Sequence, residues 1–128
     1  MCSSDLLPSE FVDGLYANTG VAPSASERGA AIDEFGAAGT SADAAARARV
    51  MRRVAENSTF AQREANKAFV LMQYFGYLRR NPNDAPDADF GGYDFWLSKL
   101  DHFNGNFVNA EMVKAFITSI EYRKRFGP

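Results

Sequence analysis

Cysteine and histidine are almost absent from this sequence: Cys2 and His102 are each the only residue of their type in 128. One cysteine excludes an internal disulfide and a cysteine-based metal cluster. One histidine, with no dependable cysteine or triad partner, gives no pattern of nucleophilic catalysis. We therefore expect His102 to lie on a polar helix face or at a helix end, and we expect no catalytic residues.

The chain also lacks an excess of either charge and any long apolar run. Its formal net charge of −2 gives no electrostatic footprint for nucleic acid or an anionic membrane. No apolar stretch approaches the roughly 18–20 residues that span a bilayer. The start shows no basic region followed by an apolar stretch, as a signal peptide would. We expect no nucleic-acid partner and no membrane insertion.

The first six residues, MCSSDL, match the translated end of a common sequencing-adapter oligonucleotide. We therefore expect residues 1–6 to be an artefact and the natural sequence of this fragment to begin near Leu7. Segments of this kind are left out of reasoning about the fold. The parent protein is then expected to extend further at its N-terminus.

What the chain does contain is a series of helical patterns, and no stretch alternates for long with the period of a strand. The first predicted helix covers residues 7–18 and ends at Gly20, a typical C-terminal cap. The second extends to Gly36 and begins with a capping box formed by Ser24 and Glu27. An alanine-rich third helix is predicted after Ser41, its expected N-cap. Its expected buried stripe is Val50, Met51 and Val54.

The fourth predicted helix runs up to the Asn81-Pro82 stop, because proline disfavours helical geometry at the preceding residue. Nearly every position from Phe69 to Leu78 is apolar, so we expect burial on most sides there. Arg79 and Arg80 are expected in its last turn, where positive charge suits the helix dipole.

Two further helices are predicted after residue 90. The inner face of the first follows helical spacing: Tyr93, Trp96, Leu97, Leu100 and Phe103. The last helix is expected to have Asn109 as its cap and a hydrophobic staple of Val108 and Val113. Its expected inner face is Val113, Phe116, Ile117 and Ile120. The sequence therefore predicts an all-α fold of about six helices.

The chain also repeats itself at a spacing of about 58 to 62 residues, typical of two copies of one structural unit. The matched pairs are Phe11 with Phe69, Val12 with Val70, Tyr16 with Tyr74, Pro23 with Pro82, Val54 with Phe116, Phe60 with Tyr122 and Arg63 with Arg125. We predict two divergent helical repeats, residues 7–66 and 67–128, that share one core. The loop of the first copy lacks the aspartates of the second.

The second copy resembles a bacterial family known as domain of unknown function 4214, whose pattern reads "FV..LY...LgR.PD..G..yW...L" and later "S.Ey...f". The matching residues are Phe69, Val70, Tyr74, Arg79, Pro82, Gly92, Tyr93, Trp96, Leu100, Ser119, Glu121 and Tyr122. The resemblance implies a small helical module, often appended to exported multidomain proteins, at the cell surface or outside the cell. We expect these motif residues to be structural.

The loop at residues 81–94 is rich in acids and turn-forming residues. Calcium binds carboxylate-rich loops, which makes Asp84, Asp87 and Asp89 candidate ligands, although the EF-hand spacing does not fit. Asp and Asn also build turns and cap helices, and this interpretation is favoured. A sugar-binding aromatic shelf is a further alternative to a packed core. Its rings would be Tyr74, Tyr77, Tyr93, Phe95 and Trp96, with Phe95 the one expected to be exposed.

The favoured function is a non-catalytic accessory or interaction module of a larger exported bacterial protein, without a cofactor. Its expected partners are the upstream domains of the parent chain, or a protein or polysaccharide surface. The alternative is a surface module that binds calcium or carbohydrate through the loop at residues 81–94. An enzyme is the least favoured interpretation.

Overall fold

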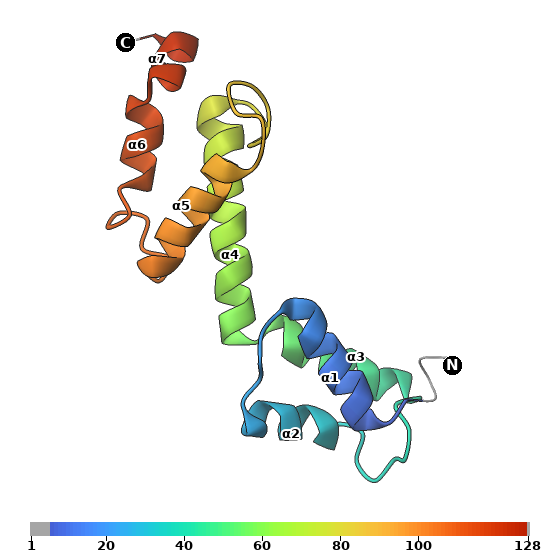
Figure 1. Ribbon diagram of the computed structural model, residues 1–128. Helices are drawn as coiled ribbons and strands as arrows, with labels where there is room; N and C mark the ends of the chain where they lie inside the picture. Colours follow the sequence, from blue (N-terminus) through green and yellow to red (C-terminus); the bar gives the residue numbers. More distant parts are fainter. Residues whose placement is uncertain (1–5, 128) are drawn as a thin grey trace. The chain divides into compact units, whose positions relative to one another are not determined.

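The computed structural model describes residues 6–127, which form seven α-helices and one π-helical segment, with no strand in that range (Figure 1). The all-α prediction is confirmed. The chain divides into two compact units, one that ends at Ala61 and one that begins at Gln62. Cys2 and most of the expected adapter segment lie outside the described residues. None of the helices over residues 6–127 has the length and apolar content of a membrane span.

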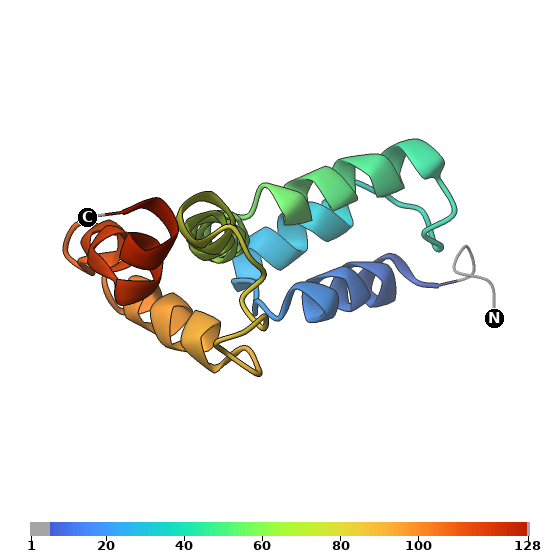
Figure 2. The ribbon, with the colours of Figure 1, turned by 90° about the horizontal axis from the view of Figure 1, so that it is seen from above.

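The first unit is built from three helices that pack pairwise against one another (Figures 1 and 2). They are α1 (Pro8–Thr19), α2 (Ala25–Asp33) and α3 (Ala44–Ala55). Their apolar faces enclose one hydrophobic cluster, made of Phe11, Val12, Tyr16, Ala31, Phe35, Ala46, Val50 and Val54.

Two predicted helix boundaries of the first unit are confirmed. Gly20 ends α1 in the left-handed conformation, with φ of 69°, which glycine adopts without steric cost. Ser24 Oγ accepts a hydrogen bond from the Glu27 amide at 3.1 Å, and Glu27 Oε2 accepts one from the Ser24 amide at 2.8 Å. This reciprocal pair is the predicted capping box.

Two predictions for α3 are wrong. Its N-cap is Asp43, whose Oδ1 accepts hydrogen bonds from the amides of Ala45 and Ala46 at 2.9 and 3.3 Å. Ser41 is instead fully buried, and its amide donates to Leu6 O at 2.8 Å. Met51 is 55% exposed, because the buried stripe of α3 follows steps of four residues from Ala46 and leaves Met51 outside it.

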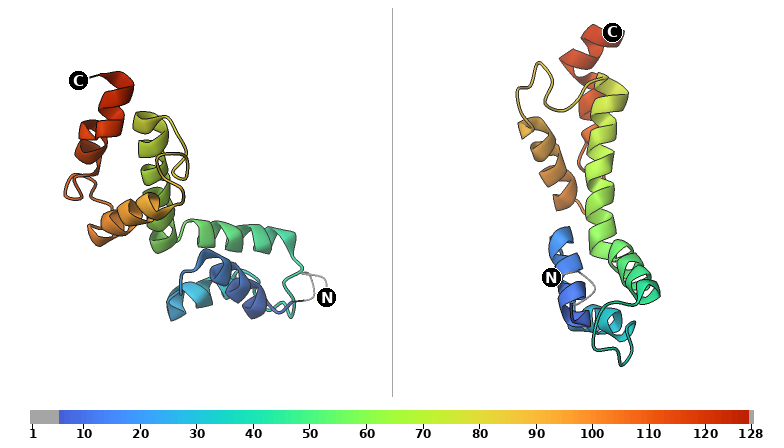
Figure 3. Two further views of the ribbon diagram at one scale, coloured as in Figure 1. Left: turned by 45° about the horizontal axis from the view of Figure 1, so that its top comes forward. Right: turned by 90° about the vertical axis from the view of Figure 1, so that its right-hand side faces the viewer.

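The second unit contains most of α4 (Ser58–Gln73), the π-helical segment η2 (Tyr74–Leu78), α5 (Gly91–His102), α6 (Met112–Thr118) and α7 (Ile120–Phe126). The helices α4 and η2 form one continuous rod (Figure 3), and α6 and α7 pack against η2. Its buried cluster is Val70, Tyr74, Leu78, Leu100, Ala110, Met112 and Phe116.

The buried hydrophobic side chains thus form two clusters, one in each unit, where the sequence predicted a single shared core. The physical reason lies in residues 61–68, the part of α4 between the two clusters. This stretch is alanine and polar residues only, so it offers no apolar face that could join the clusters.

The expected burial of residues 69–78 on most sides is also wrong. Met72 is 62% exposed and Phe75 is 49% exposed, because neighbouring helices cover only the face that carries Val70, Tyr74 and Leu78. The helical segment ends at Leu78, before the expected Asn81-Pro82 stop.

The predicted inner face of α5 is confirmed: Leu100 is buried, and Tyr93, Trp96, Leu97 and Phe103 pack against the second cluster. His102 lies exposed at the end of α5, as expected.

The predicted last helix is divided into α6 and α7. Ser119 is extended, with ψ of 150°, and its Oγ accepts a hydrogen bond from the Tyr122 amide at 3.0 Å as the cap of α7. The Asn109 cap is wrong, because α6 begins at Met112. Val108 is 67% exposed, which leaves no buried staple there.

The inner face of α6 also differs from the expected one. Met112 and Phe116 are buried, whereas Ile117 is 39% exposed and Ile120 is 73% exposed. The break at Ser119 changes the direction of the backbone between Ile117 and Ile120, so helical spacing no longer keeps both on one face.

Glu34 joins α2 to α3 by ion pairs with two arginines. Its Oε1 lies 2.6 Å from Arg53 Nε, and its Oε2 lies 2.7 Å from Arg49 Nε. Hydrogen bonds from Arg53 and then Arg49 hold the pKa of Glu34 below its ordinary value of 4.5. Because folding lowers the pKa of Glu34, its ion pairs stabilise the fold fully when the pH is above the ordinary pKa. This stabilisation is lost as the pH falls through the lowered pKa.

We predict that Glu34→Gln reduces the loss of stability on acidification. Between pH 7 and roughly pH 3, the thermal midpoint of the natural sequence should fall further than that of the variant. Circular dichroism melts across this range provide the measurement. Glu56→Gln, which changes an exposed pair with Arg52, is the matched control and should follow the natural sequence. Equal acid sensitivity of Glu34→Gln and the natural sequence would contradict the prediction.

Candidate functional site at Arg80

The residues that follow η2 bring Arg80 back over its own helix. Arg79 adopts the left-handed conformation with φ of 55°, and the amides of Arg79 and Arg80 both donate to Tyr74 O. This is the geometry of a helix C-terminus in which the left-handed residue reverses the chain. The Arg80 guanidinium carbon consequently lies 5.2 Å from the centre of the Tyr74 ring.

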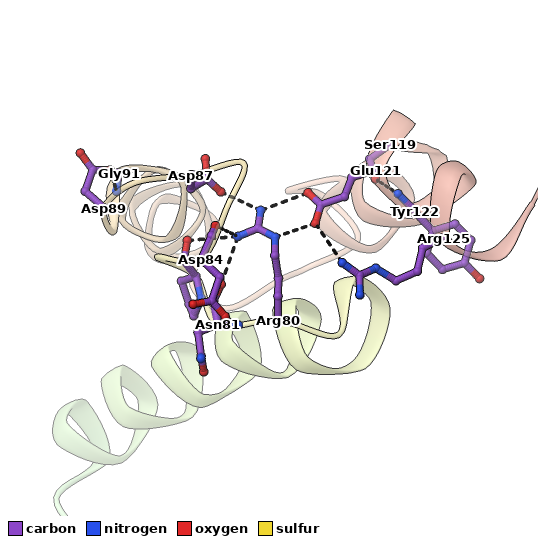
Figure 4. Close-up of polar contacts among 11 residues, drawn as sticks. Arg80, Asn81, Asp84, Asp87, Asp89, Gly91, Ser119, Glu121, Tyr122 and Arg125 are labelled. Atoms are coloured by element: carbon purple, nitrogen blue, oxygen red, sulfur yellow. Dashed lines mark hydrogen bonds and ion pairs between the residues drawn. The ribbon is translucent and has the colours of Figure 1, made fainter.

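Arg80 places its guanidinium between a loop and a helix that are distant in sequence (Figure 4). Its Nε donates to Glu121 Oε1 at 2.6 Å, and its Nη2 donates to Glu121 Oε2 at 3.1 Å. Nη2 also donates to Asp87 Oδ2 at 2.7 Å. The Arg80 side chain is only 7% exposed, against 23% for Glu121 and 36% for Asp87.

The third guanidinium nitrogen organises the loop at residues 79–90. Arg80 Nη1 donates to the carbonyl oxygens of Asn81, Pro82 and Asp84 at 3.1, 3.2 and 3.1 Å. A planar, always charged group with five N–H donors can satisfy this set, whereas a lysine ammonium cannot. The hydrogen bond to Glu121 is the main cause of a raised Arg80 pKa. Arg80 therefore connects the loop to α7 as a permanent cation.

The three candidate calcium ligands each have a separate partner. Asp84 Oδ2 accepts a hydrogen bond from the Asn81 amide at 2.9 Å, and Asp89 Oδ1 accepts one from the Gly91 amide at 2.8 Å. Asp87 pairs with Arg80. Over residues 6–127, no three His, Cys, Asp or Glu side chains form a group that could hold a metal ion.

A hollow of about 250 Å³ lies beside Arg80. Its lining residues are Tyr74, Leu78, Arg80, Asp87, Gly92, Trp96, Ala115, Phe116, Ser119 and Glu121. Burial, and then the nearby Asp87 charge, raise the pKa of Tyr74, so its hydroxyl keeps its proton at neutral pH. The hollow thus combines aromatic walls with a hydroxyl group and two carboxylates.

Five of the motif residues of the predicted resemblance line this hollow, and the motif arginine needs a change of assignment. Tyr74, Gly92, Trp96, Ser119 and Glu121 all line it. The arginine that lines it is Arg80, whereas the sequence interpretation assigned the motif arginine to Arg79. The motif spacing itself was the missed signal: "R.P" places the arginine two residues before Pro82, and the preceding "g" coincides with the left-handed Arg79.

The other motif residues lie in the second cluster or its loop. Phe69, Tyr93 and Tyr122 pack against the buried cluster, and Pro82 is buried. Tyr74, Tyr77 and Trp96 of the possible aromatic shelf also belong to this packing. Phe95 is 59% exposed, as expected.

Comparisons of the chain with family models, curated proteins and solved structures find no match. The chemistry of the site is therefore inferred from its geometry alone. Arg80 pairs with the carboxylates of both Asp87 and Glu121, and Arg125 lies 4.0 Å from Glu121, an arrangement that stabilises the loop.

We predict opposite effects for substitutions at two adjacent arginines. Arg80→Met leaves Asp87 without its cation and Glu121 with only Arg125, 4.0 Å away. It should cost about 2–4 kcal/mol, somewhat below the range for fully buried pairs because both carboxylates contact water. Arg79→Gly should stabilise by about 0.5–1 kcal/mol, because relief of the left-handed conformation exceeds the entropy cost of glycine.

Urea denaturation followed by Trp96 fluorescence measures both effects. Lys67→Met, which breaks the exposed pair with Glu64 in the same unit, should change the free energy of unfolding by less than about 1 kcal/mol. A similar cost for Arg80→Met and Lys67→Met would show that the Arg80 network does not hold the second unit together.

Proposed function

We propose that this chain is a non-catalytic interaction module of a larger exported bacterial protein, with a relationship to domain of unknown function 4214. The observation that carries the proposal is the apolar surface of the second unit. Nine large hydrophobic side chains between Gln62 and Phe126 are exposed, against two in the described part of the first unit. The nine are Met72, Phe75, Phe90, Phe95, Phe107, Val108, Ile117, Ile120 and Phe126.

Part of this surface is concentrated at the start of α6. Phe107, Val108 and Val113 line a hollow of about 310 Å³ together with the charged residues Glu111 and Lys114. Apolar surface bordered by charged residues is typical of interaction sites. The pairing of charges around Arg80 supports a structural role for those groups, in agreement with a module that binds and does not catalyse.

The ends of the helices support the proposed repeat. Gly20 and Arg79 are both left-handed helix caps, and each lies three residues before an aligned proline. Asn57 Oδ1 accepts a hydrogen bond from the Phe60 amide at 3.1 Å, just as Ser119 Oγ accepts one from the Tyr122 amide at 3.0 Å. Phe60 and Tyr122 are an aligned pair.

The π-helical segment accounts for the one-residue gap of the repeat. Tyr74 follows Tyr16 by 58 positions, whereas Pro82 follows Pro23 by 59. The additional residue falls in or just after η2, where a hydrogen bond spans five residues in place of four. On this alignment, α4 joins the last helix of the first copy to the first helix of the second.

The partners that we propose are the upstream domains of the parent chain. The test uses the protein region that the parent gene encodes upstream of this chain. This region is produced as a separate protein, and calorimetry measures its affinity for the chain. Val108→Ser combined with Ile120→Ser should weaken binding at least about tenfold, because truncation of a central apolar contact costs more than about 1 kcal/mol.

Leu7→Ser combined with Met51→Ser is the matched control, since these side chains are 52% and 55% exposed in the first unit. The control should bind as the natural sequence does, and neither pair should change the melting temperature appreciably, because exposed positions contribute little to stability. Failure of the natural chain to bind the upstream region, or equal weakening by both pairs, would contradict the proposed partner and surface.

A further inference from the structure

The hollow beside Arg80 has walls of two chemical kinds. Rings of Tyr74, Trp96 and Phe116 form the apolar wall, and Trp96 is partly exposed. Asp87 and Glu121 supply carboxylate oxygens on the polar wall. Apolar walls with a few polar groups in fixed positions are typical of small-molecule sites.

The polar groups of the hollow differ in what they can still bind. Arg80 uses all three nitrogens on six oxygen atoms of the same unit, so it has nothing to offer an anion. Ser119 Oγ donates to Phe116 O and accepts from the Tyr122 amide. Within the described residues, neither Asp87 Oδ1 nor Tyr74 Oη forms a hydrogen bond to another protein group. Both atoms can therefore form hydrogen bonds to a ligand.

Gly92 leaves room for the Tyr74 hydroxyl, which a side chain at this position would displace. A Cβ atom at this position would lie 2.7 Å from Tyr74 Oη and 3.7 and 3.9 Å from the Asp87 carboxylate oxygens. Gly92 lies in the first turn of α5, where glycine costs helix stability relative to alanine. Space, and not an unusual backbone conformation, explains glycine here.

We propose that this hollow binds a neutral polyhydroxylated group, namely a single sugar unit of a glycan. Sugar hydroxyls would donate to Asp87 Oδ1 and share a hydrogen bond with Tyr74 Oη, while the C–H face of the ring lies against Trp96. An anion would meet two carboxylates. A cation would meet the permanently charged guanidinium of Arg80, which lines the hollow.

The first unit has a hollow of about 440 Å³ beside Tyr16, the residue aligned with Tyr74. Its polar groups are differently engaged: Glu27 Oε1 accepts a hydrogen bond from Asn57 Nδ2 at 2.8 Å, and no tryptophan lines the described hollow. Tyr16 and Tyr74 are both buried and both have a raised pKa, chiefly because of burial. Tyr16→Phe is therefore the matched control for Tyr74→Phe.

This inference goes beyond the proposed interaction surface, because Val108 and Ile120 do not line the hollow. The two proposals are tested by different experiments, so either one can fail alone. Titration with free sugars tests the hollow without a protein partner, and binding of the upstream region tests the apolar surface.

The test is an amide-resolved NMR titration of the chain with the methyl glycosides of glucose, galactose and mannose. We expect at least one of them to give saturable shifts at the Gly92 amide and the Trp96 indole N–H, with a dissociation constant on the order of millimolar, as suits a single small sugar. Tyr74→Phe should weaken this binding at least about tenfold, and Asp87→Asn should do the same.

Tyr16→Phe should leave the affinity unchanged, and the unliganded spectra establish that each variant is folded. If Asp87→Asn disturbs the loop, the result for Tyr74→Phe decides whether the proposal holds. This variant removes only the hydroxyl and keeps the ring that packs against Phe116. The proposal is overturned by unsaturable shifts with all three glycosides, by equal weakening in Tyr16→Phe, or by tighter binding of tetramethylammonium or phosphate at the same amides.

Discussion

The second unit depends on one buried cation. Arg80 is only 7% exposed, and a charge in that position is tolerated only if it is paired and its donors are satisfied. Six oxygen atoms meet this requirement: three loop carbonyls, one oxygen of Asp87 and both oxygens of Glu121. The path of the loop and the position of α7 against η2 are therefore consequences of the same requirement, and the hollow is the space that this arrangement leaves beside Tyr74.

On the proposed repeat alignment, the first unit has no counterpart of Arg80 at the corresponding corner. The residue two positions before the proline is Val21 in the first copy and Arg80 in the second. Val21 is buried and needs no acidic partner. This difference accounts for the aspartates of the second loop in physical terms. Asp87 compensates the arginine that the first copy lacks, while Asp84 and Asp89 accept hydrogen bonds from nearby amides.

The second unit has two different kinds of surface, the hollow beside the Arg80 network and the exposed apolar side chains. Charged groups at the hollow are paired with one another and hold the loop, so they are fixed in position. The large apolar side chains are exposed elsewhere, both on the outer faces of the helices and, for Phe90, Phe107 and Val108, in the connections between helices. A hollow with aromatic walls and a few polar groups suits a small ligand, whereas exposed apolar side chains suit a macromolecular partner.

The sequence by itself determined the features that depend on residues within about one helical turn. The helical periodicity, the Ser24–Glu27 capping box, the Gly20 cap and the inner face of α5 are of this kind. Only the tertiary structure decided which helix faces are covered, and so Met51, Met72 and Ile120 are exposed although each belongs to an apolar pattern. It also decided the site, because Glu121 lies 41 residues from Arg80. No local pattern encodes a pairing at that distance, since it exists only when α7 packs against η2.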